Sequence, residues 1–160
     1  GLGLFHSSSF ADDEQKKETR RKGIYFIQKN GAALFLRNTI PNLFSEKAKA
    51  EGPEMIEKLI DLSKSFKAEA LIQYYEAMIK RPDRSPILKS FKKPVLIIAG
   101  MHDNAVPFQS ILSQSYLAAV TYFHVLKFSG HMGMWEEEAA STLYMESFLR
   151  GLQGKYQDEI

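Results

Sequence analysis

The strongest constraint on the fold is the run Val95-Leu96-Ile97-Ile98-Ala99, which is apolar at every position and ends at Gly100. A strand with one solvated face alternates apolar and polar residues, whereas a strand covered by helices on both faces is apolar throughout. From Pro86 onward the sequence predicts helices and strands in alternation, a pattern typical of a parallel sheet with right-handed crossovers. We therefore expect an α/β fold built around this strand.

The expected elements after Pro86 follow one another without long gaps. They are a short helix at 87–91, a strand at 95–99, a helix at 109–120, a strand at 122–127 and a final helix at 136–152. Residues 2–5 alternate in the manner of another short strand, and a polar loop follows them. The sheet is therefore expected to contain about three strands.

Helix follows helix between residues 12 and 84. Asp12 is the expected N-cap of a helix over 13–29, because Gln15 stands three residues later and Asn30-Gly31 ends the pattern. Further helices are expected at 32–37, from Pro53 to about residue 66, and at 68–80. The sequence thus predicts a first strand and loop over 1–11, a helical insert over 12–84 and a β/α part over 85–160.

Composition narrows the class of protein. The 160 residues are 44% hydrophobic and 25% charged, which is typical of an ordinary globular domain. A formal charge of +2 gives no field that would favour nucleic acid or a membrane surface. The apolar runs are far shorter than a membrane span, and the absence of cysteine fits a reducing compartment. We expect a cytoplasmic protein with neither a nucleic-acid nor a membrane partner.

Two polar residues follow the expected strands in the β/α part. Asp103 comes after strand 95–99 and His131 after strand 122–127, at the carboxyl ends where open parallel sheets bind ligands. A histidine there could take a proton from a nucleophile and return it to a leaving group, with the aspartate holding its tautomer. Taken singly, Asp103 fits a turn residue and His131 a packing residue. Their order and spacing together favour catalysis.

These motifs resemble the acid and base of the α/β-hydrolase triad, in which Ser, Asp or Glu, and His follow one another and the Ser lies in a G-x-S-x-G elbow. Gly100 and Asp103 match the acid motif, and Gly130 and His131 match the base motif. Residues 2–7 look like the strand after the nucleophile helix, and the helical insert looks like the cap of such enzymes. The opening segment is most similar to esterase and lactonase members.

The resemblance implies a partial α/β-hydrolase sheet with a helical cap, and it implies hydrolysis of a small ester, lactone or amide through an acyl-enzyme. No G-x-S-x-G occurs in the sequence. We therefore expect a C-terminal hydrolase part that is inactive alone, with its nucleophile and N-terminal half outside this chain. Haloperoxidase-like and carbon–carbon hydrolase activities remain open within the fold. The alternative is a non-catalytic module that forms a homodimer, or binds the missing half, through an exposed sheet edge.

Other candidate groups surround the acid and base. His6, Phe35, Tyr75 and Met132 are expected to line a pocket for a small, moderately hydrophobic acyl substrate. The serines at 7–9 lack the flanking glycines of an elbow and are assigned to the loop. No cofactor is expected, because no G-x-G-x-x-G or Walker-type loop is present. No metal site is expected, because no pair of histidines has helical ligand spacing.

Overall fold

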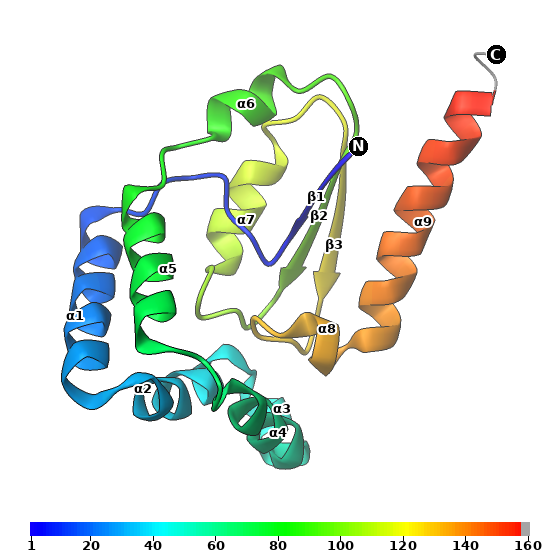
Figure 1. Cartoon of the computed structure of the whole chain (residues 1–160). Helices are drawn as coiled ribbons and strands as arrows, with labels where there is room; N and C mark the ends of the chain where they lie inside the picture. The colour runs from blue at the N-terminus through cyan, green and yellow to red at the C-terminus, as the bar shows by residue number, and fades with distance from the viewer. Residues whose placement is uncertain (158–160) are drawn as a thin grey trace.

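The computed structural model describes residues 1–157, in which three strands and the helices that cover them follow the order shown in Figure 1. The strands are β1 (Leu2–Phe5), β2 (Val95–Gly100) and β3 (Thr121–Leu126). The helices are α1 (Glu14–Asn30), α2 (Ala32–Thr39), the 3-10 helix η1 (Ile40–Leu43), α3 (Glu46–Glu51), α4 (Pro53–Ser63), α5 (Ala68–Lys80), α6 (Ser85–Ser90), α7 (Phe108–Ser115), α8 (Gly133–Glu136) and α9 (Glu138–Gln157). No helix within this described part is long and apolar enough to cross a membrane.

The three strands form one parallel sheet in the order β1-β2-β3. Every residue of β2 is buried, as its unbroken apolar sequence predicts. Val95, Ile97 and Ala99 pack on one face against the side of α6 and α7, whereas Leu96 and Ile98 pack on the other against α9. Figure 1 shows α7 and α9 on opposite sides of the strands. The expected α/β fold with a three-stranded parallel sheet is confirmed.

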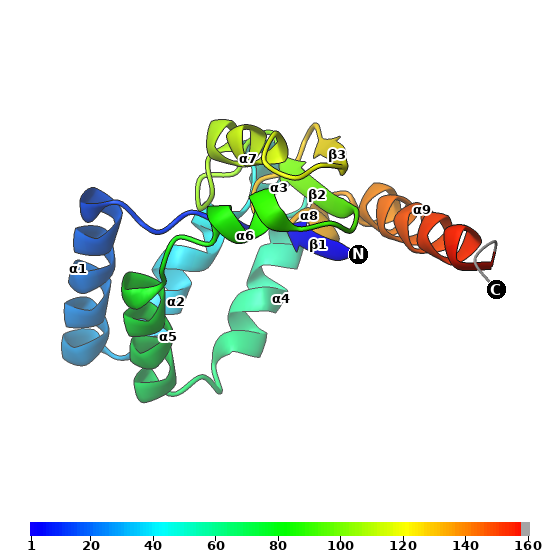
Figure 2. The ribbon, with the colours of Figure 1, turned by 90° about the horizontal axis from the view of Figure 1, so that it is seen from above.

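Helices α1 to α5 form the helical insert, in which α2, α3 and α4 lie beyond the carboxyl ends of the strands and α1 and α5 lie to one side, at the left in Figure 1 (Figures 1 and 2). One apolar cluster joins α1, α2 and α5 through Ile27, Ala32 and Leu71. A second cluster is built on Phe44 and its neighbours in η1 and α4, and Trp135 of α8 packs against it. This second cluster fixes the insert to the end of the sheet at which β2 and β3 end.

The first helix begins one residue later than expected. Asp13, not Asp12, is its N-cap, and the Asp13 side chain accepts a hydrogen bond from the backbone N–H of Lys16. Asp12 is buried instead and forms ion pairs with Arg20 and Arg81, which lie at the two ends of the helical insert. Two adjacent aspartates are equally good caps, so local sequence could not separate them.

Several helix limits also differ from expectation. Helix α7 ends at Ser115 rather than near residue 120. The final helix α9 begins at Glu138 rather than residue 136, and the short helix α8 before it was not expected. Helix α4 ends at Ser63, so Phe66 lies outside it with about half of its surface exposed. Helix α3 was not expected at all; it begins after Ser45, whose hydroxyl accepts from the backbone N–H of Ala48.

Candidate active site

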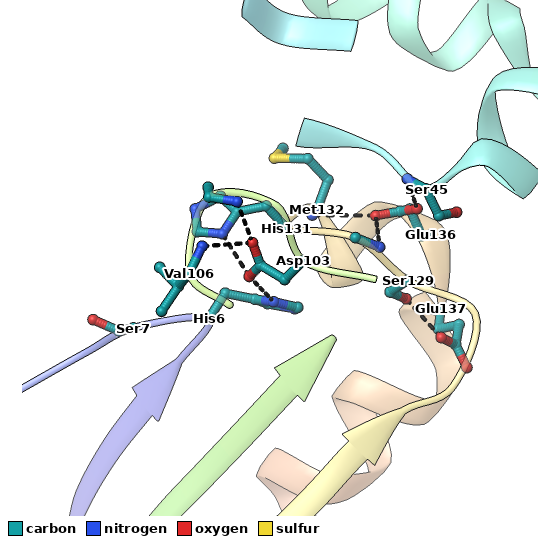
Figure 3. Close-up of polar contacts among 12 residues, drawn as sticks. His6, Ser7, Ser45, Asp103, Val106, Ser129, His131, Met132, Glu136 and Glu137 are labelled. Carbon is teal, nitrogen blue, oxygen red and sulfur yellow. Dashed lines mark hydrogen bonds and ion pairs between the residues drawn. The ribbon is translucent and has the colours of Figure 1, made fainter. Parts of the chain in front are cut away.

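The turn after β2 holds Asp103 in a buried position. The polypeptide turns at Gly100, and only 5% of Asp103 remains exposed. One carboxylate oxygen, Oδ1, accepts hydrogen bonds from the backbone N–H groups of Ala105 and Val106, both at 2.8 Å. These bonds are typical of an aspartate that stabilises its own turn. They leave the second oxygen, Oδ2, directed toward the neighbouring strand ends (Figure 3).

Two histidines meet that second oxygen. Nδ1 of His131 lies 2.8 Å from Oδ2 of Asp103, and Nδ1 of His6 lies 3.1 Å from the same atom. An ionised carboxylate only accepts hydrogen bonds, so each imidazole donates through a protonated Nδ1. Figure 3 shows the two rings on either side of the carboxylate. The structure thus brings together the acid and base candidates predicted from sequence.

The environment of Asp103 favours its charged form. Burial opposes ionisation, but hydrogen bonds from His131, from His6 and from the Val106 amide outweigh it and hold the pKa of Asp103 well below its ordinary value. The carboxylate therefore stays negative across the range in which histidines titrate. A permanent negative charge beside Nδ1 can stabilise a protonated imidazole.

The loop that carries His131 is held by two glutamates of the helix turn that follows it. Glu136 accepts from the backbone N–H groups of Gly130 and Met132, at 2.9 and 3.2 Å. Glu137 accepts from the hydroxyl of Ser129 at 2.6 Å. The sequence analysis did not predict either role. The available signal was a pair of acidic residues a few positions after a glycine-rich loop, but such pairs are also common in surface helices.

His6 has a different position from the one expected. It is only 3% exposed, and its ring faces Asp103 rather than an open pocket. The parallel register pairs Phe5 with Ile98, so the residue after β1 lies at the same sheet edge as the residues after β2. This adjacency was the signal that could have found the His6–Asp103 contact.

The other expected pocket residues pack against apolar neighbours. Phe35 and Tyr75 contact each other edge to face in the helical insert, with ring centroids 5.4 Å apart. Met132 packs against the cluster around Phe44. A hollow of about 500 Å³ adjoins the Asp103 turn. It is lined by Ser45, Glu46, Lys47, Met101, His102, Asp103, Asn104 and Phe128, so none of the four expected pocket residues lines it.

The same three side chains are the one group among the described residues that could hold a metal ion, since their ligand atoms lie within 4.8 Å of one another. Binding through both Nδ1 atoms would require each histidine to carry its proton on Nε2. Nε2 of His6 is buried and has no hydrogen-bond partner in the described structure. A proton there would be an unpaired buried donor, which is costly. The geometry therefore favours hydrogen bonding over metal coordination.

Neither a protein-family model nor a curated protein matches the chain by sequence. Solved structures do match. A thermophilic esterase from Thermogutta terrifontis, studied with malate bound, is 25% identical with a TM-score of 0.86, and the match covers 94% of this chain and 56% of that one. The chain has the fold of the C-terminal part of an α/β-hydrolase.

Two further α/β-hydrolase structures show the same partial overlap. The enol-lactonase from Burkholderia xenovorans LB400 is 19% identical with a TM-score of 0.81, covering 92% of this chain and 55% of its own. An esterase from Exiguobacterium antarcticum is 18% identical with a TM-score of 0.80, covering 93% and 56%. The chain therefore spans little more than half the length of the α/β-hydrolases that it matches.

Proposed function

We propose that this chain supplies the acid and the base of a serine hydrolase that cleaves a small ester, lactone or amide. The observation that carries the proposal is the 2.8 Å contact between Nδ1 of His131 and Oδ2 of Asp103, placed beyond the carboxyl ends of adjacent parallel strands. Similarity to an esterase and an enol-lactonase supports this substrate class.

The orientation of His131 suits a general base. Because Nδ1 donates to Asp103, Nε2 carries a lone pair that can take a proton from a serine hydroxyl. The serine oxygen then forms a bond to the acyl carbon, and His131 returns the proton to the leaving group to give an acyl-enzyme. A water molecule then attacks the acyl-enzyme with His131 again as the base, and the carboxylic acid product and the free serine are released. Asp103 stabilises the imidazolium in both halves of the reaction.

The nucleophile in this proposal lies outside the 160 residues. In the loop after β1, the Ser8 hydroxyl accepts from the backbone N–H of Phe10, and the backbone N–H of Ser9 donates to the buried side chain of Gln114. A G-x-S-x-G elbow is expected in residues encoded before this chain or in a partner that completes the sheet. The chain alone is expected to be inactive.

A fluorophosphonate probe, which forms a covalent adduct with an activated serine, tests the proposal by intact mass. The 160-residue chain should stay unmodified, whereas the longest reading frame that carries it should gain one adduct on an upstream serine. In that longer protein, H131A should slow labelling by about 10⁴-fold. H124A is the control, because His124 lies on β3 and stacks on Tyr144 instead. Labelling unaffected by H131A, or a reading frame without an elbow, would overturn the proposal.

A specific observation also favours a second function. β1 pairs with β2 alone in the described sheet, so its other edge presents unpaired backbone groups. A non-catalytic module that associates with a second copy, or with the strand that would precede β1, would cover this edge.

A further inference from the structure

His6 occupies a site that is shaped for its ring. Its backbone has φ of 45°, a left-handed conformation that costs most residues energy and that histidine adopts more often than apolar residues do. Two glycines lie against the imidazole: a Cβ on Gly133 would lie 2.4 Å from Nε2 of His6, and a Cβ on Gly100 would lie 2.9 Å from its Cε1 and closer still to the carbonyl oxygen of Gly130. The ring thus fills a space that alanine at either glycine would close.

The backbone conformation and the buried ring of His6 both carry an energetic cost. Left-handed backbone is energetically unfavourable for a residue with a side chain, and Nε2 of His6 lies buried with no hydrogen-bond partner among the described residues. Within residues 1–157 the ring makes one polar contact, the 3.1 Å bond from Nδ1 to Oδ2 of Asp103. The ring also contacts the rings of Phe5 and His131, so the bond to Asp103 is its polar link to the candidate site.

The bond acts on an oxygen that His131 also uses. Oδ1 of Asp103 is fixed by two backbone N–H groups, so Oδ2 is the atom left for both imidazoles. A hydrogen bond to a carboxylate stabilises its negative charge, so a second donor leaves less of that charge to stabilise a proton on the first imidazole. A bond from His6 to Oδ2 is therefore expected to reduce the stabilisation that Asp103 gives to protonated His131.

We propose that His6 is a positioning residue, which holds Oδ2 of Asp103 in place and tunes the readiness of His131 to accept and release a proton. The inference rests on the proposed function, in which His131 is the general base. In a hydrolase, a base that holds its proton too tightly returns it slowly to the leaving group. Sharing Oδ2 between two donors prevents this.

Other charged groups around the carboxylate are unaffected by a change at His6. Lys16 of α1 donates to the carbonyl oxygen of Ala105 and acts electrostatically on Asp103. Glu136 of α8 bonds to the backbone on both sides of His131. Glu46, Lys47 and His102 line the adjoining hollow with Asp103. Because these five charged or titratable side chains remain in every variant, a change in the titration midpoint of His131 can be assigned to residue 6.

Asparagine and leucine at position 6 form a matched pair. Their side chains have the same branched shape, but only asparagine keeps an N–H donor near the position of Nδ1, and it tolerates left-handed backbone. The test follows the ring protons of His131 by NMR as the pH of the 160-residue chain is varied. The His131 midpoint should lie roughly half a unit to one unit higher in H6L than in wild type. H6N should restore most of the wild-type midpoint.

Equal midpoints in wild type, H6N and H6L, or equal shifts in both variants, would overturn the proposal, because a packing role alone predicts no difference between a donor and a non-donor. If H6L does not fold, H6G replaces it, since glycine accepts the backbone conformation without supplying a donor. The NMR measurement needs no nucleophile. The NMR titration can contradict the role of His6 while the fluorophosphonate experiment supports the hydrolase proposal, or the other way round. The two proposals are therefore tested separately.

Discussion

The backbone N–H of His131 donates to the carbonyl oxygen of Leu43 across a distance of 2.7 Å. Leu43 ends η1 in the helical insert, so this bond joins the loop of the candidate base directly to the insert. The adjacent Gly130 lies against the same segment. The position of His131 therefore depends on the docking of the insert as well as on β3.

Gly130 is the point of closest approach in this contact. A Cβ at this position would lie 2.7 Å from the carbonyl oxygen of Leu43 and 2.9 Å from the backbone of Ser45, and backbone atoms cannot move aside cheaply. We expect G130A to lower the free energy of unfolding by about 2–3 kcal/mol. Urea denaturation measures this loss. G3A is the control, because nothing lies within 4 Å of a Cβ on Gly3; equal losses in both variants would contradict the account.

The carboxylate of Glu136 supports the same junction from the other side. It accepts from the backbone N–H of Ser45 in the insert, at 2.8 Å, as well as from Gly130 and Met132. Hydrogen bonds to a charged group are worth more than neutral ones, and E136A leaves three donors without it. We expect a loss of about 3 kcal/mol in stability and faster hydrogen exchange at the Gly130 amide. E57A, at an exposed position on α4, should change stability by less than about 0.5 kcal/mol.

Sequence patterns predicted those parts of the fold and site that depend on local rules. The side chains of the apolar run of β2 can be buried on both faces only between two layers of helices, and every residue of β2 is buried in this way. Asp103 and His131 were expected to meet because residues beyond the carboxyl ends of neighbouring parallel strands share one edge of the sheet. Their catalytic role stays a prediction.

Contacts that join distant segments were not predictable in the same way. His6 bonds to Asp103 because β1 pairs with β2, although the whole helical insert separates these strands in sequence. Glu136 bonds to Ser45 because the insert docks on the base loop, and no local pattern encodes that docking. Asp12 and Asp13 look alike as caps, and only the positions of Arg20 and Arg81 separate them.

The buried Asp12 should make the chain sensitive to acid. Burial opposes its ionisation, but hydrogen bonding and the charges of Arg20, Lys16 and Arg81 lower the pKa of Asp12 below the ordinary 3.8. A lowered pKa adds stability that is complete above pH 3.8 and is lost as the pH falls through the folded-state value.

Replacing Asp12 by asparagine removes this contribution and the negative charge that Arg20 and Arg81 share. D12N should lower the free energy of unfolding at pH 7 by about 3 kcal/mol, and the difference from wild type should shrink below pH 4. Urea denaturation at a series of pH values measures both effects. D13N is the matched control, since asparagine also serves as an N-cap. A difference that stays constant down to pH 2 would contradict the assignment.

His124 should titrate below the ordinary histidine value. Its ring stacks on Tyr144 with centroids 4.1 Å apart, and burial lowers the pKa of His124 below 6.5 because the charged form loses hydration. Stability linked to this group is therefore complete above pH 6.5 and falls as the pH drops below it. NMR titration should show the low midpoint. Y144A should move it toward 6.5, whereas Y116A, at an exposed position, should not.

The outer edge of β1 should drive association of the isolated chain. The backbone N–H groups of Leu2 and His6 donate to Pro94 and Ile98 on the β2 side, so alternation along the strand turns those of Gly3 and Phe5 outward. G3P removes one outward donor without touching a bond to β2, and proline is tolerated at sheet edges. Size-exclusion chromatography with light scattering should show wild type and G3A associating as concentration rises, and G3P remaining monomeric. A wild-type chain that is monomeric at every concentration, or a G3P variant that associates equally well, would exclude this edge as the contact surface.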